Sequence, residues 1–182
     1  SYREIEDLKK AYSWAKKQKL TFSAFLKAHQ KLSRSIIKES NYRGVVRDKG
    51  VYVYNQGIKV YSGPSAEILP ELLKQLFSDI DFLLKQSLSI EQVFYYAAMI
   101  HLVMVQIHPF ADGNGRASRL LEKWFLASKL GSDAWFLQSE RLYQKRLKSY
   151  YKNVNIGSDY SLINYDLALP FLLMLPMSLR IK

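Results

Sequence analysis

The chain has 182 residues, 48% of them hydrophobic, so it is long enough to bury a core and short enough to form one domain. Its 27 Lys and Arg outnumber its 16 Asp and Glu, and the formal net charge of +11 favours ATP, acidic protein surfaces or nucleic acid as partners without choosing among them. The absence of cysteine excludes disulfides, thiolate metal sites and cysteine nucleophiles, and it is compatible with a reducing cytoplasm. We expect a single cytoplasmic domain over residues 1–182.

No membrane partner is expected. Residues 1–20 are charged throughout and lack the apolar segment of a signal peptide. The most apolar stretch, residues 167–179, is shorter than the roughly 20 residues that span a bilayer, and it contains two prolines. We expect this stretch to form a buried helix.

The N-terminal region predicts two helices. In the first, apolar residues recur at three- and four-residue spacing among charged ones. They are Ile5, Leu8, Tyr12 and Ala15. Thr21 is a suitable N-cap for the second helix, in which we expect His29 to be a packed residue rather than a metal ligand.

Between residues 41 and 63 the apolar period changes from helical to alternating. Two alternating runs, over residues 51–54 and 58–61, flank the turn sequence Asn55-Gln56-Gly57, which is typical of a β-hairpin. We place the hairpin at about residues 45–62. Because no other strand is predicted, it must pack on helices or serve in binding.

The pattern is helical again after the hairpin. A third helix is predicted to start at Ser65, with Ile68 and later apolar residues on its buried side. Ser89 is the expected cap of a fourth helix over residues 90–107, which is apolar nearly all round and should run through the centre of the domain. His101 lies in this helix, and we expect it to make a buried polar contact.

Three further helices complete the predicted fold. The fifth ends near Gly131, and two more are expected around residues 139–153 and 161–175. The fold class is therefore mainly α, a helical bundle with one β-hairpin.

The central helix is followed by His-Pro-Phe-Ala-Asp-Gly-Asn-Gly-Arg-Ala-Ser-Arg, residues 108–119, which carries the chemistry. Pro109 fixes a turn, so the imidazole of His108 should project from a rigid corner. The intrinsic pKa of imidazole lies near neutrality, which suits a general base.

The next residues are suited to phosphate. Gly113 and Gly115 flank Asn114 and permit the backbone conformation in which N–H groups at a helix start form an anion-binding nest. Arg116 and Arg119 are three residues apart on the new helix, so both guanidinium groups can reach phosphate oxygens on one side.

Asp112 precedes this nest. A single carboxylate beside bound phosphates suits Mg²⁺, or Mn²⁺ in its place, with phosphate oxygens and water completing the coordination. The alternative is that residues 108–119 are merely a polar connection between two helices. That alternative accounts for the Gly and Asn residues but not for the His and the two Arg.

Residues 108–119 match, at every fixed position, the signature of the Fic family: His-Pro-Phe, any residue, Asp or Glu, Gly-Asn-Gly-Arg, any two residues, Arg. The chain also resembles this family in the upstream hairpin, in His101 seven residues before the motif, and in the tyrosine pair Tyr150 and Tyr151. The resemblance implies a Fic-type helical bundle whose hairpin is the family's flap, with motif loop and helix over residues 108–130.

The resemblance also implies a protein adenylyltransferase, which transfers AMP from ATP to a Ser, Thr or Tyr hydroxyl of a target protein. His108 would be the base and Asp112 would hold the metal at the α- and β-phosphates. Residues 113–115 would line the phosphates, and Arg116 and Arg119 would hold the β- and γ-phosphates. The glycine at residue 115 differs from the lysine of the related Doc toxins, in which protein phosphorylation is observed.

Further contacts follow from the resemblance alone. The flap would pair with an extended segment of the target protein, and an arginine precedes the flap in the family, for which we prefer Arg47 to Arg43. The flap residues are Val51, Tyr52, Val53 and Tyr54. Adenine or ribose would contact Tyr150, Tyr151 and Asn155. An inhibitory segment or an antitoxin partner would act on Arg119.

Two other function classes stay open. One is a Fic-fold enzyme that transfers a phosphoryl or phosphocholine group. The other is a non-enzymatic basic module that binds nucleic acid or a partner protein. Because the lysines are scattered over many predicted helices rather than forming one stripe, we do not expect nucleic acid as a partner.

Overall fold

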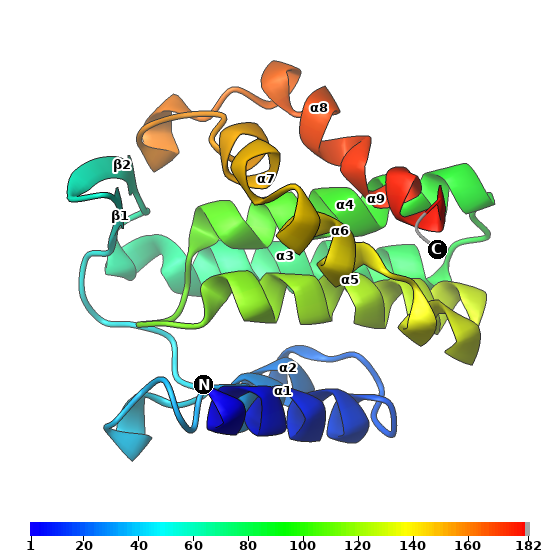
Figure 1. Cartoon of the computed structure of the whole chain (residues 1–182), viewed down its shortest axis with the longest axis horizontal. Helices are drawn as coiled ribbons and strands as arrows, with labels where there is room; N and C mark the ends of the chain where they lie inside the picture. Colours follow the sequence, from blue (N-terminus) through cyan, green and yellow to red (C-terminus); the bar gives the residue numbers. More distant parts are fainter. Residues whose placement is uncertain (181–182) are drawn as a thin grey trace.

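The computed structural model describes residues 1–180, and it is mainly helical with one two-stranded antiparallel sheet (Figure 1). The predicted fold class is confirmed. The helices are α1 (Tyr2–Ala15), α2 (Phe22–Leu32), α3 (Leu69–Lys85), α4 (Ile90–Ile107), α5 (Asn114–Leu130), α6 (Ser139–Lys145), α7 (Leu147–Val154), α8 (Leu169–Leu172) and α9 (Met174–Met177). The strands are β1 (Tyr52–Asn55) and β2 (Ile58–Ser62).

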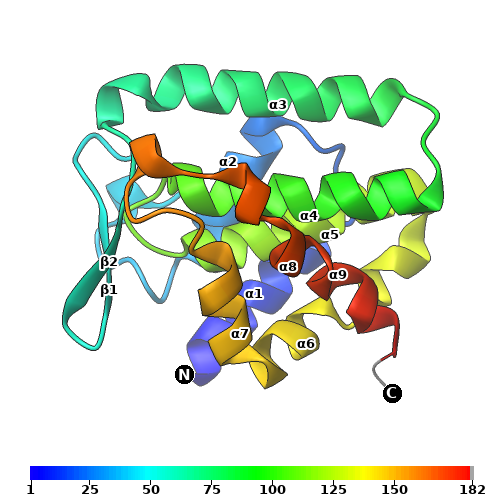
Figure 2. The same ribbon diagram turned by 90° about the horizontal axis from the view of Figure 1, so that it is seen from above.

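Helices α4 and α5 lie side by side at the centre of the molecule. The pair α1 and α2 packs on one side of them and the segment α6–α9 on the other, while α3 runs beside α4 (Figures 1 and 2). Within residues 1–180, α4 is the one helix long and apolar enough to cross a membrane, but 56% of it is buried inside the protein. Its apolar composition is therefore explained by its place in the core.

The central helices begin and end where local sequence signals place them. The Ser89 hydroxyl accepts a hydrogen bond from the Gln92 N–H, and the Gln92 side chain accepts one from the Ser89 N–H, which makes a capping box at the start of α4. Helix α5 ends at Gly131, whose φ of 96° favours glycine. The predicted caps at Thr21 and Ser89 are both confirmed.

The hairpin turns at Gln56 and Gly57, both with positive φ, as in the two-residue turns that match strand twist. Its base is fixed to the core because the Tyr61 hydroxyl donates to the Gln106 carbonyl of α4 at 2.5 Å. The end of β2 also makes a bridge from Ser62 to Asp159, whereas within residues 1–180 no strand pairs with the outer edge of β1.

Two apolar positions predicted to be buried are exposed. Ile5 is 55% exposed, because α1 instead buries Asp7, whose carboxylate accepts a hydrogen bond from the Ser35 hydroxyl at 2.5 Å. Ile68 is 44% exposed, because it belongs to a 3-10 turn before α3 rather than to the buried face of that helix.

The two C-terminal helices were predicted as continuous, and this was wrong. The helix expected at 139–153 is interrupted at Arg146, and the one expected at 161–175 consists of short helical pieces, with a proline in each of α8 and α9. Residues 167–179 are not a buried helix either. One face, including Phe171 and Leu175, is buried, while Leu169 on the other is 61% exposed.

Candidate active site

His108 is the residue at which α4 ends, and its backbone is left-handed, with φ 49° and ψ 57°. Its ring Nδ1 lies 3.1 Å from the Val105 carbonyl oxygen, and since a carbonyl can only accept, Nδ1 carries the proton. The other nitrogen, Nε2, is therefore the basic atom. Burial lowers the pKa of His108, and the Arg47 guanidinium adds to this effect, while the Val105 carbonyl and Asp112 oppose it.

The Arg47 side chain joins the base of the hairpin to the turn that follows α4. It is buried, and its guanidinium donates hydrogen bonds to the carbonyls of His108 at 2.8 Å, Pro64 at 2.8 Å and Lys49 at 2.6 Å. The Arg47 backbone N–H also donates to the Pro109 carbonyl at 2.9 Å. The preference for Arg47 as the arginine that precedes the flap agrees with this position.

His29 of α2 contacts the motif loop, residues 108–113, through a hydrogen bond and a ring stack. Its Nδ1 accepts from the Gly44 N–H at 3.0 Å, so its Nε2 carries the proton and donates to the Asp112 carbonyl at 2.9 Å. The ring is fully buried and stacks on Phe110 with centroids 3.6 Å apart, and burial lowers its pKa to about 4. The predicted packing role is confirmed, but nothing in the local sequence pattern indicated these distant partners.

Asn114 closes the loop with its side chain. Its Oδ1 accepts from the Phe110 N–H and its Nδ2 donates to the Phe110 carbonyl, both at 2.9 Å. Next to it Gly113 has a φ of 80°, and a β-carbon there would lie 3.0 Å from the Ile36 side chain. Because the Asn114 amide is already used in the loop, only its backbone N–H remains for the predicted phosphate contact.

The start of α5 is open to an anion. Among the described residues no side chain caps this helix, so the N–H groups of its first turn, at residues 114–116, carry the positive end of the helix dipole. The Gly113 N–H donates to Oδ1 of Asp112 at 2.5 Å, and this short bond keeps the exposed Asp112 carboxylate beside the helix start.

Asp112 fits a metal ion that arrives with phosphates. No group of three His, Cys, Asp or Glu side chains within residues 1–180 is arranged to hold a metal by itself. Mg²⁺ commonly takes one or two protein carboxylates and fills its other positions with phosphate oxygens and water. One exposed carboxylate at an anion-binding helix start suits that mode.

The two motif arginines have different neighbours. Arg116 forms an ion pair with Glu4 of α1 at 2.6 Å, with both side chains about 30% exposed. The pKa of Glu4 is lowered, first by the hydrogen bond from Ser1 and also by the one from Arg116. A phosphate bound by Arg116 would therefore have to replace or share this partner.

Arg119 extends from α5 toward α7. Its Nη1 lies 3.4 Å from the position that a β-carbon would occupy at Gly115. Burial raises the pKa of the Tyr150 hydroxyl to about 12, and the positive charge of Arg119 opposes this shift. Tyr150 is only 4% exposed and therefore belongs to the core. This corrects the prediction that it lies on a nucleotide-binding surface. Tyr151 and Asn155 are exposed, and their contact with adenine or ribose stays a prediction.

The fold and the loop together define a Fic-type domain. A sequence model of the Fic/DOC family matches residues 19–126, which is more than half of the chain. The chain belongs to the Fic/DOC family.

Named relatives and solved structures agree with this membership. The chain is 41% identical over 64 residues to protein adenylyltransferase fic-1 of Caenorhabditis briggsae, a match that covers 35% of this chain and 13% of that protein. It is similar in fold to a Fic family protein from Desulfovibrio desulfuricans, with a TM-score of 0.74 at 20% identity over 97% of this chain and 53% of that one.

A third similarity is to BepC of Bartonella tribocorum, a structure with bound AMPPNP. The TM-score is 0.66 at 16% identity, over 96% of this chain and 83% of that chain. Likeness at these identities shows the fold alone. The chain also spans only a small part of the length of the curated relatives it matches.

Proposed function

We propose that this protein is a protein adenylyltransferase that transfers AMP from ATP to a side-chain hydroxyl of a target protein. The observation that carries the proposal is the state of His108. Its Nδ1 is fixed on the Val105 carbonyl, which leaves Nε2 as a base at the anion-binding start of α5. The family membership and the adenylyltransferase names of relatives support the same reaction.

In this proposal His108 removes a proton from the target hydroxyl while one bond to the α-phosphorus forms and another breaks. Nε2 accepts the proton of the target hydroxyl as the hydroxyl oxygen attacks the α-phosphorus of ATP. A new bond forms between that oxygen and the α-phosphorus, the bond from the α-phosphorus to its bridging oxygen breaks, and pyrophosphate leaves with the electron pair. Since its pKa is lowered, His108 is neutral and ready to accept a proton at neutral pH.

The chain's other motif residues bind and orient the nucleotide. The N–H groups of residues 114–116 and the guanidinium groups of Arg116 and Arg119 would hold phosphate oxygens. Asp112 would hold Mg²⁺ or Mn²⁺, which when bound neutralises charge on the phosphates. The AMPPNP in the BepC structure is consistent with an ATP-like ligand in this fold.

The target protein would dock along the hairpin. The outer edge of β1 has no strand partner within residues 1–180, and Tyr52 and Tyr54 beside it are 57% and 62% exposed. An extended target segment could add to this edge through backbone hydrogen bonds, with the tyrosines contacting its side chains. Arg47 donates hydrogen bonds both to the Pro64 carbonyl at the hairpin base and to the His108 carbonyl. A target segment bound on this edge would therefore lie close to Nε2 of His108.

The test is transfer of label from ATP. The protein is incubated with Mg²⁺, cell lysate and ATP labelled at either the α- or the γ-phosphate, and protein-bound label is measured. The proposal predicts label from the α-position only. Label from the γ-position would indicate phosphoryl transfer, and absence of both labels, with Mn²⁺ also tried, would contradict the proposed enzyme activity.

A further inference from the structure

The peptide unit between Asp112 and Gly113 is hydrogen-bonded at both of its ends. Its carbonyl oxygen, on Asp112, accepts from Nε2 of His29 at 2.9 Å, and within residues 1–180 no other donor reaches that oxygen. Its N–H, on Gly113, donates to Oδ1 of Asp112 at 2.5 Å. Because a trans peptide unit is planar, its C=O and N–H point in opposite directions. His29 therefore holds the carbonyl toward α2 and, through the plane, the N–H toward the Asp112 carboxylate.

The ring of His29 is itself fixed by two contacts. The Gly44 N–H donates to Nδ1 at 3.0 Å, which places the ring proton on Nε2, where it meets the Asp112 carbonyl. The ring also stacks on Phe110, with centroids 3.6 Å apart and planes 7° from parallel, and it is fully buried. A stacked, buried ring with both nitrogens paired has one stable orientation, so Nε2–H is a fixed donor.

Gly44 can reach His29 because it has no side chain. Its φ is 72°, and a β-carbon there would lie 2.5 Å from the Leu26 carbonyl oxygen of α2. Three residues later, the Arg47 N–H donates to the Pro109 carbonyl at 2.9 Å. The segment before the hairpin therefore holds the motif loop at two points, directly at Pro109 and through His29 at Asp112.

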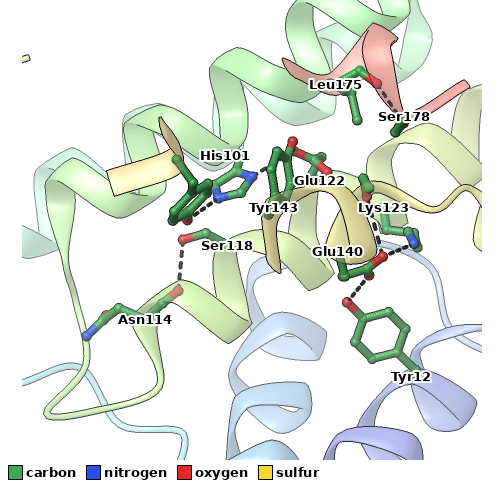
Figure 3. Close-up of polar contacts among 12 residues, drawn as sticks. Tyr12, His101, Asn114, Ser118, Glu122, Lys123, Glu140, Tyr143, Leu175 and Ser178 are labelled. Carbon is green, nitrogen blue, oxygen red and sulfur yellow. Dashed lines mark hydrogen bonds and ion pairs between the residues drawn. The ribbon is translucent and has the colours of Figure 1, made fainter. Parts of the chain in front are cut away.

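The residues that follow this peptide unit are held without His29. The Asn114 side chain binds both the N–H and the carbonyl of Phe110, each at 2.9 Å. The Asn114 carbonyl accepts from the Ser118 hydroxyl at 2.9 Å, as Figure 3 shows. Because none of these contacts involves the peptide unit between Asp112 and Gly113, they do not determine which way it faces.

This peptide unit has a second orientation open to it. Turning the plane over changes ψ of one residue and φ of the next while the neighbouring chain stays in place, which is how type I and type II turns differ. The φ of 80° at Gly113 belongs to the observed orientation. In the other orientation the carbonyl would face the Asp112 carboxylate and would repel an anion at the start of α5.

We propose that His29 is a positioning residue that holds the peptide unit between Asp112 and Gly113 with its N–H, and not its carbonyl, toward the phosphate side of the motif loop. Its effect on ATP rests on the proposed function. Without His29 the Asp112 carbonyl would lose its buried donor, and turning toward solvent would become favourable. His29 thus keeps the anion site in its binding form before the ligand arrives, which lowers the cost of binding.

The experiment compares variants of two matched histidines. His29→Leu removes the donor to Asp112, and His29→Gln keeps an amide that can donate in its place. The control is His101→Asn, because His101 is also fully buried and also has both ring nitrogens paired, with Nδ1 2.6 Å from Oε2 of Glu122. Removing either histidine costs stability, but only His29 contacts the motif loop.

The first readout needs no nucleotide. Hydrogen exchange of the Gly113 N–H is followed by NMR and compared with that of Ala97, a buried residue of α4 that records global opening. Relative to Ala97, exchange at Gly113 should become at least about tenfold faster in His29→Leu and about threefold faster in His29→Gln, and should change less than about twofold in His101→Asn. Unchanged exchange in the His29 variants, or an equal increase in the control, would overturn the inference.

The second readout is the ATP Kd, measured by calorimetric titration with Mg²⁺. It should rise about five- to tenfold in His29→Leu, less in His29→Gln, and less than about twofold in His101→Asn. Faster exchange at Gly113 without a loss of ATP affinity would overturn the inference and leave the proposed function standing. If wild type itself bound no ATP, the proposed function would fail, and the exchange data would still decide whether His29 fixes the peptide unit.

Discussion

The three histidines of the chain differ in how their ring nitrogens are used. Both ring nitrogens of His29 are hydrogen-bonded, one to the Gly44 N–H and one to the Asp112 carbonyl. Both ring nitrogens of His101 are hydrogen-bonded to buried side chains, those of Glu122 and Tyr150. His108 makes a hydrogen bond through Nδ1 only, as far as residues 1–180 are concerned. Proton transfer needs a nitrogen with a free lone pair, which is why the proposed function gives that role to His108 and structural roles to the other two.

The ion pair between Glu4 and Arg116 gives a prediction at the scale of one residue. Glu4→Gln removes the charge that competes with phosphate for Arg116, so the ATP Kd should fall by up to about fivefold. The gain should shrink at high salt, because both side chains are partly exposed. Calorimetric titration at two salt concentrations measures it.

The matched control for this prediction is Glu6→Gln on the same helix. Within the part of the chain that the structure describes, Glu6 forms an ion pair only with Lys9, which is also on α1, at 3.9 Å. Removing it changes the net charge by the same amount without touching Arg116. If both variants strengthen ATP binding equally, a general charge effect and not the Arg116 contact is responsible.

The hairpin, as an element, depends on contacts at its base more than on its own two strands. A lone hairpin is marginal in water. Here the Tyr61 hydroxyl binds the Gln106 carbonyl, and Arg47 binds carbonyls on both sides of the hairpin as well as that of His108. The hairpin and the turn that follows α4 are therefore fixed to each other.

Replacing Arg47 should uncouple the flap. Arg47→Ala leaves three carbonyls without their donor, so we expect a loss of about 2–4 kcal/mol in the free energy of unfolding, measured in urea. Arg43→Ala is the control, since Arg43 donates to the carbonyls of Ile37 and Lys38, before the hairpin. An equal loss of unfolding free energy in the two variants would contradict a particular role of Arg47 in fixing the hairpin.

At the scale of the whole molecule, stability should decrease in mild acid. The pKa of His29 falls from 6.5 to about 4 on folding because the ring is buried, so below pH 6.5 the unfolded chain binds a proton that the folded protein does not. Stability is therefore full above the unfolded pKa and is lost as pH falls toward 4. We expect the free energy of unfolding to drop by about 2 kcal/mol from this group between pH 8 and pH 5.

His29→Gln tests this origin, since glutamine does not titrate and can still form hydrogen bonds. The variant should be less stable at pH 8 but should lose less stability than wild type on going to pH 5. The lowered pKa of His108 acts in the same direction and accounts for a remaining slope. A pH dependence identical to that of wild type would rule His29 out as its source.

The sequence predicted what local signals determine. The caps at Thr21 and Ser89, the hairpin and the helix that ends near Gly131 are set by residues adjacent in the chain. The pieces after residue 139 were predicted less well, because apolar periodicity does not reveal where prolines and tertiary contacts break a helix.

The candidate site, too, was predictable only where its residues are adjacent in the sequence. The motif at residues 108–119 was visible because its spacing is local. The roles of His29, Arg47 and Tyr150 were not, since each depends on partners brought close only by folding. The contact of Arg116 with Glu4 spans 112 residues and has no counterpart in the local pattern.

The most direct test of His108 as the general base compares ATP binding with AMP transfer in His108→Ala. The assignment of the base to Nε2 predicts that the ATP Kd stays within about twofold of wild type, because the anion-binding start of α5 is intact. Transfer of α-label to protein should fall at least about 100-fold. Retention of transfer, or loss of ATP binding together with transfer, would contradict the assignment.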